Sequence, residues 1–290
     1  MMKSGTGEGV KVAISAPDNF VAPYIMEMLG DAAVPIPAEA MSEPLMLDAL
    51  LTSCNAIIHI NSKPSDETLG RNDRETLLRM REQSRPIIDA VDRHGELHLI
   101  IVGTLRVHPQ WEPDDDYYGS DSTLAPRDVA AEGQLWAEEV ALERAQAERP
   151  VSIIRASNVQ GILLDGSEGN GLLHRWAQES MIGWVNIPGD GSGIKDFVHV
   201  QDLVAVIGAV LQSPPPTRES IAVGCGKGIT MSDLAGLYSQ RTGCESEFGQ
   251  DESQEVFGIV DAQELGMRLG FIPQISLEEM IEEAFGFASQ

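Results

Sequence analysis

The sequence predicts an α/β fold in which a parallel sheet is covered on both faces by helices and is followed by a smaller mixed α/β lobe. Compact apolar runs bounded by polar or turn residues alternate with long segments whose apolar residues recur every three or four positions. Strands and helices that alternate in this way form a doubly wound parallel sheet. After residue 161 glycine-rich loops replace the alternation, and we expect the smaller lobe to begin there.

The elements follow one another with short connections. A β-branched run at 10–15 predicts the first strand, and crowded apolar residues at 20–29 predict the helix after it. A short second strand at 34–36 leads almost directly into a helix at 44–51. The other predicted elements are strands at 56–60, 97–102 and 151–154 and helices at 72–94, 126–148 and 201–211.

The chain divides into two units by this pattern. Residues 9–160 form the sheet domain, to which 195–211 return, and residues 161–194 and 212–290 form the smaller lobe, which we expect to bind substrate. A chain of 290 residues with 42% hydrophobic content is long enough to bury a full core.

Composition excludes several classes of function. With 45 acidic and 20 basic residues the formal charge is −25, which repels nucleic acid phosphates and anionic lipid surfaces. No stretch holds the roughly 20 apolar residues that a membrane span needs, and the N-terminus lacks an apolar signal core. The three cysteines lack metal-ligand spacing, and the two histidines of 94–98 lie at a surface turn, so we expect no metal and a cytoplasmic protein.

Four strings resemble one known family. Their residues are Ala-Ile-Ile-His-Ile at 56–60, Arg-Ala-Ser-Asn-Val-Gln-Gly at 155–161, Gly-Asp-Gly at 189–191 with Lys-Asp-Phe-Val-His-Val-Gln-Asp at 195–202, and Leu-Gly-Phe-Ile-Pro at 269–273. In this order they resemble the extended short-chain dehydrogenase/reductases, the NAD-dependent epimerase/dehydratase family that modifies nucleotide sugars. The resemblance spans about 10–287 and implies a Rossmann-like sheet with a C-terminal substrate lobe.

The resemblance also implies a dinucleotide turn after the first strand. Its three glycines let the backbone approach a pyrophosphate at a helix N-terminus. Ala16, Asn19 and Ala22 stand at those positions here, and Asp18 beside them would repel a pyrophosphate. Only Glu39 is a candidate for the acidic residue on the adenosine ribose. We therefore expect an atypical member without a nicotinamide cofactor.

The family's catalytic residues are a Ser or Thr after a buried strand and a Tyr-x-x-x-Lys pair on the next helix. The lysine lowers the tyrosine pKa, and the tyrosine exchanges a proton as hydride moves. Thr104 stands at the Ser/Thr position, but Ala130 replaces the tyrosine and Gln134 the lysine. Neither side chain can perform that chemistry, so we expect hydride transfer by this mechanism to be lost.

Substrate-side residues remain. Asn158 and Lys195 fall where the family contacts a nucleotide diphosphate, although Lys195 could equally be a solvated surface lysine. His108 and the tyrosines Tyr117 and Tyr118 are the nearby substitutes for the missing acid–base group. The expected partner is a small polar, nucleotide-sugar-like ligand.

Three functions stay open at this stage. The chain could be a ligand-binding or accessory protein, or a non-redox lyase or isomerase; alternatively, it is an NAD(P)-dependent nucleotide-sugar epimerase, dehydratase or reductase with divergent motifs, which would bind NAD or NADP. Whether it is an enzyme is undecided. The resemblance further implies a homodimer through the helices at 72–94 and 126–148.

Overall fold

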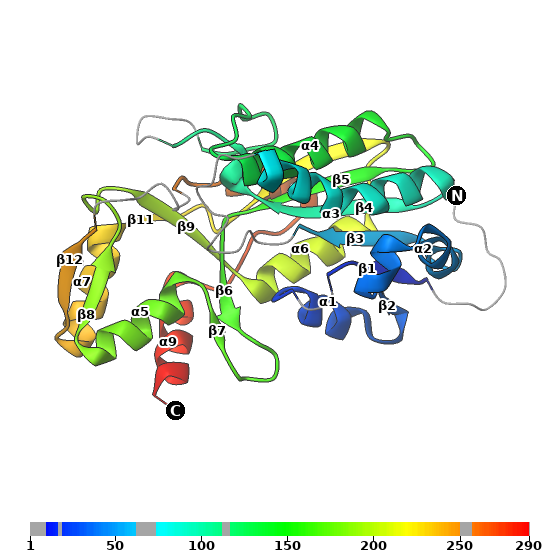
Figure 1. Cartoon of the computed structure of the whole chain (residues 1–290). Coiled ribbons are helices and arrows are strands. Elements are labelled where there is room, and N and C mark those ends of the chain that lie inside the picture. Colours follow the sequence, from blue (N-terminus) through cyan, green and yellow to red (C-terminus); the bar gives the residue numbers. More distant parts are fainter. Residues whose placement is uncertain (1–9, 17–18, 62–73, 112–116, 250–256, 290) are drawn as a thin grey trace.

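The computed structural model describes residues 10–16, 19–61, 74–111, 117–249 and 257–289 (Figure 1). Its largest unit is a six-stranded sheet in the order β10-β5-β4-β3-β1-β2, and every neighbouring pair in it is parallel. The strands are β1 (Val12–Ile14), β2 (Ala33–Pro35), β3 (Ala56–Ile60), β4 (His98–Thr104), β5 (Val151–Ala156) and β10 (Arg218–Val223). The expected doubly wound α/β fold is confirmed.

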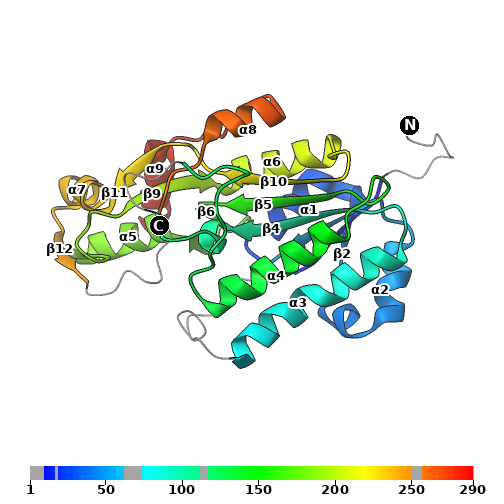
Figure 2. The same cartoon turned by 90° about the horizontal axis from the view of Figure 1, so that it is seen from above.

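Helices cover both faces of this sheet (Figure 2). β3 and β5 are buried along their whole length, which explains why their sequences are continuous apolar runs. On one face the core packs against α1 and α6, and on the other it packs against α2, α3 and α4. These helices are α1 (Ala22–Leu29), α2 (Pro44–Leu51), α3 (Arg74–Arg93), α4 (Val129–Glu143) and α6 (Val200–Gln212).

Local signals fix where several helices begin. The Asp128 carboxylate accepts a hydrogen bond from the Ala131 N–H at 2.8 Å and so caps α4, which begins three residues after Pro126. α9 (Leu277–Ala288) starts with a capping box, in which Ser276 and Glu279 satisfy each other's backbone N–H groups. Such caps bind N–H groups that the first turn of a helix leaves without partners.

The remaining elements form a smaller unit at one end of the sheet (Figure 1). A four-stranded sheet has the order β11-β9-β6-β7, and β12 pairs with β8 in a second small sheet. Their apolar core centres on Trp176 and Tyr238, whose rings meet edge to face. The elements of this unit are β6 (Asn158–Ile162), β7 (Gly169–Asn170), α5 (Leu172–Ile182), β8 (Trp184–Ile187), β9 (Ile194–His199), β11 (Gly228–Thr230), α7 (Met231–Thr242) and β12 (Glu245–Phe248). In contrast, α8 (Ala262–Leu269) packs on the large sheet beside β10 and α6 (Figure 2).

One segment differs from the sequence expectation. Residues 212–290 were expected in the smaller lobe, yet β10 pairs with β5 along its six residues and extends the large sheet. Its short Arg-Glu-Ser-Ile-Ala-Val sequence begins with polar residues because β10 lies at the edge of the sheet, where no described strand pairs with its outer side. The domain boundaries themselves stay a prediction. In the described part of the chain, no helix combines the length and the apolarity needed to cross a membrane.

Candidate functional site

The carboxyl ends of β1, β3, β4 and β5 meet at one edge of the large sheet, where parallel α/β sheets bind ligands. The turn after β1 begins with Ala16, which has a φ of +52°. It is the one non-glycine residue with a positive φ among those that the structure describes. Ala16 therefore adopts the left-handed conformation that glycine takes without strain.

Hydrogen bonds then lead this turn into α1. The Asn19 N–H donates to the Ala16 carbonyl at 2.9 Å, and the Ala22 N–H donates to the Asn19 carbonyl at 3.0 Å. The Asn19 side chain accepts from the Val21 N–H at 2.9 Å. The turn is thus closed by backbone bonds without its glycines. Asp18, which the sequence interpretation invoked, lies outside the described residues.

Thr104 is the last residue of β4 and stands beside the turn that leads toward α4. Its side-chain oxygen accepts a hydrogen bond from the Arg106 N–H at 3.4 Å. On α4, Ala130 is 1% exposed and Gln134 is 5% exposed. The two positions expected for a tyrosine and a lysine therefore hold a buried methyl group and a buried neutral amide.

Two buried ion pairs lie in this region. The Arg106 guanidinium pairs with Asp128, the residue that caps α4. The Arg155 guanidinium donates from Nε to Oε2 of Glu138 at 2.9 Å, and both side chains are almost fully buried. Burial raises the pKa of Glu138 to about 7, although Arg155 acts in the opposite direction. The charges of these four residues are thus paired with one another.

A chain of buried polar side chains connects β1 to this region. Ser15 Oγ lies 2.7 Å from His59 Nδ1, and His59 Nε2 lies 2.9 Å from Ser84 Oγ. The Ser84 hydroxyl donates to Asn61 Oδ1 at 3.2 Å. Burial lowers the pKa of His59 to about 4, so the ring is neutral near pH 7.

Gly103 is the point where this chain approaches the ion pair. A Cβ at Gly103 would lie 3.1 Å from Glu138 Oε1 and 3.5 Å from Asn61 Nδ2. Neither of those atoms has a hydrogen-bond partner among the described residues. The glycine of Val-Gly-Thr thus leaves room between two buried polar groups.

His108 does not line an open cleft, because its side chain is fully buried. Its Nδ1 donates to the Thr123 carbonyl at 2.8 Å, and its ring stacks on Tyr118 at 4.7 Å. Burial lowers the His108 pKa to about 4. The Tyr118 hydroxyl donates to the Pro109 carbonyl at 2.8 Å, and Tyr117 is half exposed. The structure therefore places His108 and Tyr118 within the packing of the loop after β4.

Asn158 and Lys195 are brought together from β6 and β9. The Lys195 ammonium donates to Asn158 Oδ1 at 3.1 Å and lies 5.1 Å from the ring centre of Phe257. Lys195 is only 1% exposed, so it is not a solvated surface lysine. The Asn158 amide in turn donates to the Asp196 carbonyl at 2.8 Å, which fixes its orientation.

Asp196, Glu138 and Arg155 are charged residues that the sequence interpretation did not single out. The Asp196 carboxylate accepts hydrogen bonds from the N–H groups of Cys225, Gly226 and Val260 at 3.0 to 3.1 Å. Burial raises its pKa to about 6. Asp196 thereby joins β9 to two loops of the smaller unit. Arg155 and Asp196 lie within the family-like strings at 155–161 and 195–202, so the resemblance could have pointed to them as functional residues.

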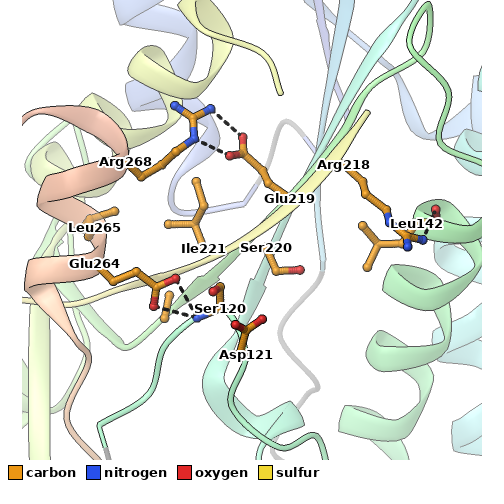
Figure 3. A pocket seen from close by; sticks show the side chains of 11 residues that line it. Ser120, Asp121, Leu142, Arg218, Glu219, Ser220, Ile221, Glu264, Leu265 and Arg268 are labelled. Atoms are coloured by element: carbon orange, nitrogen blue, oxygen red, sulfur yellow. Dashed lines mark hydrogen bonds and ion pairs between the residues drawn. The ribbon is translucent and has the colours of Figure 1, made fainter. Parts of the chain in front are cut away.

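Two open hollows lie near the loop after β4. One of about 530 Å³ is lined by Trp111, Tyr117 and Tyr118 together with acidic residues. The other, of about 430 Å³, lies between β10, α4 and α8 (Figure 3). Neither is lined by Thr104, Ala130 or Lys195. Among the residues with described positions, no group of three or more His, Cys, Asp and Glu side chains could hold a metal ion.

Comparisons with known proteins identify the fold and the family. The profile of the "NAD dependent epimerase/dehydratase family" matches residues 40–224. A search of curated proteins finds no match. Solved structures of the same fold include the UDP-glucuronic acid 4-epimerase of Bacillus cereus with UDP-glucuronic acid and NAD, at 16% identity and a TM-score of 0.78 over 97% of this chain and 99% of that one.

Two further structures are similarly close. The dTDP-glucose 4,6-dehydratase of Bacillus anthracis in complex with NAD has 13% identity and a TM-score of 0.78, over 97% of each chain. The UDP-glucose 4-epimerase of Thermotoga maritima with UDP-glucose has 17% identity and a TM-score of 0.78, over 96% of this chain and 98% of that one. Likeness at this level of identity establishes the fold.

These comparisons correct the expectation that the protein has no nicotinamide cofactor. The Bacillus cereus epimerase and the Bacillus anthracis dehydratase both contain NAD. The expectation rested on the absent glycines, but Ala16 keeps the left-handed backbone that the first of them would supply. With the family profile matched over 40–224 and the fold shared along nearly its whole length, the chain belongs to the NAD dependent epimerase/dehydratase family.

Proposed function

We propose that this protein binds NAD together with a nucleotide-sugar-like ligand and lacks the hydride transfer that depends on a Tyr-Lys pair. The observation that carries the proposal is the pair of buried residues on α4, Ala130 and Gln134. NAD supplies a hydride acceptor when it is bound. An alanine and a glutamine supply no proton acceptor for the substrate hydroxyl, which must lose its proton as the hydride leaves.

The β1–α1 turn fits a dinucleotide. Ala16 directs the chain through a left-handed turn, and the Asn19 and Ala22 N–H groups close it onto the start of α1. A helix N-terminus favours the negative charge of a pyrophosphate. Residues 16 and 19–22 would therefore hold that part of the cofactor, with Ala16 in the place of a glycine.

On the ligand side, Lys195 and Asn158 support recognition of an anionic nucleotide sugar. The ammonium is held by Asn158 and by the face of the Phe257 ring. A buried cation of this kind attracts a phosphate more strongly than an exposed lysine does, because the surrounding dielectric constant is lower. Similar structures contain UDP-glucose or UDP-glucuronic acid.

We also propose that the protein is a homodimer through α3 and α4. These helices pack side by side on one face of the sheet (Figure 2). Leu78 on α3 is 45% exposed, and the Trp136 ring on α4 contacts Arg81 and Arg85, whose guanidinium carbons are 5.6 and 5.7 Å from its centre. Large apolar and arginine side chains of this kind are enriched in protein interfaces.

The test is a titration with NADH, followed by nicotinamide fluorescence, and then incubation of the NAD complex with UDP-glucose and UDP-glucuronic acid. We expect saturable binding in the NADH titration. In the incubation of the NAD complex, we expect neither sugar nucleotide to reduce the bound NAD. A matched pair of variants locates the site: Ala16→Asp adds a charge that repels pyrophosphate, whereas Ala16→Asn has a similar shape without the charge, and both residues tolerate a positive φ. Binding should be lost in the first and retained in the second.

Two results would contradict the proposal. Reduction of bound NAD by either sugar nucleotide would show that another residue serves as the acid–base group. Absence of NADH binding by a folded protein, as judged by its thermal unfolding, would show that the turn does not hold the cofactor.

A further inference from the structure

β10 is an edge strand, and no described strand pairs with the backbone groups on its outer side. The carbonyls of Thr217 and Val223 accept hydrogen bonds from Val151 and Ser157 on the β5 side, at 2.9 and 2.8 Å. Successive residues of a strand point their backbone groups to opposite sides, so Arg218, Ser220 and Ala222 direct theirs away from β5. In the described part of the chain, β10 has β5 as its one strand neighbour.

The hollow of about 430 Å³ lies along this outer side (Figure 3). Leu142 of α4 lines it from one face of the sheet, while Leu265 and Arg268 of α8 line it from the other. Residues 218–222 of β10 also line it, with side chains that alternate between the two faces. The hollow therefore lies in the plane of the sheet, where a seventh strand would stand.

Several polar groups of the hollow are already satisfied. Arg268 donates from Nε and Nη2 to the Glu219 carboxylate at 2.6 and 3.1 Å, and the Glu264 carboxylate accepts from the Ser120 N–H at 2.9 Å (Figure 3). Arg268 and Glu219 thus neutralise each other, and the Glu264 carboxylate keeps its charge but is bound to the Ser120 N–H. Leu265 lines the same side of the hollow with the edge of a side chain that is only 1% exposed.

The other polar groups are available. Arg218 is exposed, and its guanidinium makes one long contact, 3.5 Å from Nη1 to the Leu142 carbonyl, among the described residues. Asp121 has no hydrogen bond or ion pair among the described residues, and neither do the outward backbone groups of Ser220. In Figure 3 Asp121 lies below Ser220, and Arg218 lies toward Leu142. The rim thus offers one cation, one anion and a backbone donor and acceptor.

We propose that this slot binds an extended peptide segment of a partner protein, which adds to β10 as a further strand. Backbone hydrogen bonds to Ser220 give the affinity, as in other cases of strand addition. On the α4 side an acidic residue of the peptide meets Arg218 and a basic residue meets Asp121, while on the α8 side apolar residues meet Leu265. The recognised sequence therefore alternates charged or polar with apolar residues.

The probe is a capped heptapeptide, Val-Glu-Val-Thr-Val-Lys-Val, labelled with a fluorophore and titrated with the full chain. We expect saturable binding by fluorescence anisotropy and, in spectra of isotope-labelled protein, shifts of the amide signals of Ser220 and Ala222. The same peptide with its two central valines replaced by proline cannot extend a sheet and should not bind.

Three variants separate the backbone contact from the side chains. Ser220→Pro removes one outward N–H but leaves the ladder to β5 intact, and should weaken binding about tenfold by leaving a carbonyl of the peptide unpaired. Ser220→Ala keeps the N–H and should bind like the parent. Arg218→Glu, an exposed change with no effect on the core, should weaken binding by a similar factor through repulsion of the peptide glutamate.

Equal binding by the parent and by both Ser220→Pro and Arg218→Glu would overturn the proposal, as would a lack of binding by the parent. A change in the oligomeric state of the free protein on Ser220→Pro, seen by light scattering, would identify a second copy of the chain as the occupant and would also overturn it.

Discussion

Glu138 and Arg155 form an ion pair, 2.9 Å long, that connects the middle of α4 to β5 and has almost no contact with solvent. Two charges can remain ionised at such depth when each is compensated by the other. The pair also fixes α4, which carries Ala130 and Gln134, against the strand that carries Arg155.

Replacing one member of this pair should therefore lower the free energy of unfolding more than replacing both members together. Glu138→Leu and Arg155→Met each leave one buried charge without its partner, and each should lower the free energy of unfolding by about 3–5 kcal/mol. The double variant should lose much less than the sum of the two. Urea denaturation of the four proteins measures this coupling, and additive single losses would show that the two residues do not act as a pair.

The left-handed conformation of Ala16 predicts a substitution that raises the free energy of unfolding instead of lowering it. Ala16 has a φ of +52°, a conformation that costs a residue with a Cβ roughly 1 kcal/mol more than glycine. Ala16→Gly should raise the free energy of unfolding by about that amount, less the greater entropy of glycine in the unfolded chain. Denaturation midpoints test this, with Ala22→Gly as the control, because Ala22 lies in α1 and glycine there should destabilise.

Three buried histidines should make the protein sensitive to acid. Burial lowers the pKa values of His59, His98 and His108 from 6.5 to about 4. In the unfolded chain these rings bind protons below pH 6.5, but in the folded protein they do so only near pH 4. The stability that each neutral ring contributes is thus complete above pH 6.5 and is lost as the pH falls toward 4.

The test compares a variant with its parent, because the raised pKa values of Glu138 and Asp196 act in the opposite direction. Their contribution to stability decreases as pH rises from the ordinary carboxyl range to between 6 and 7. His98→Gln can still hydrogen-bond Ser152, and its stability relative to the parent should improve steadily from pH 6.5 to pH 4. A constant difference over this range would refute the low pKa of His98.

The proposed dimer can be tested at one exposed position. Leu78→Glu on α3 adds a charge to the surface that α3 and α4 share with the second copy, and should convert the dimer into a monomer at micromolar concentration. Leu45→Glu is the control, since Leu45 is 86% exposed and lies on α2, which is not one of the two proposed interface helices. Light scattering distinguishes these outcomes; a monomeric parent would exclude the dimer.

Hydrophobic patterning predicted the large sheet well because its inner strands are buried on both faces. The runs at 56–60 and 44–51 coincide with β3 and α2. β10 was assigned to the other lobe because an edge strand starting with Arg-Glu-Ser carries no such pattern. α4 was expected to run from 126 to 148, but Asp128 caps it and it ends at Glu143.

The site was predictable only as a set of positions. The resemblance to the family implied that Asn158 and Lys195 both contact a nucleotide diphosphate, and in the structure the two side chains are in contact. It gave no sign that Lys195 is buried beneath Phe257, because that contact joins residues 62 positions apart in the sequence. His108 was a reasonable acid–base candidate by residue type, but its burial in the loop packing depends on Tyr118 and Thr123, which no local pattern reveals.

The pairing of β10 with β5 has a consequence for synthesis of the chain. Val151 is translated long before its partner Arg218, so β5 emerges from the ribosome with one edge open while the whole of the smaller unit's first half is being made. Contacts of such long sequence separation form slowly, and an unpaired apolar strand edge favours aggregation. The nascent chain therefore exposes an unpaired edge of β5 until residue 223 has been synthesised.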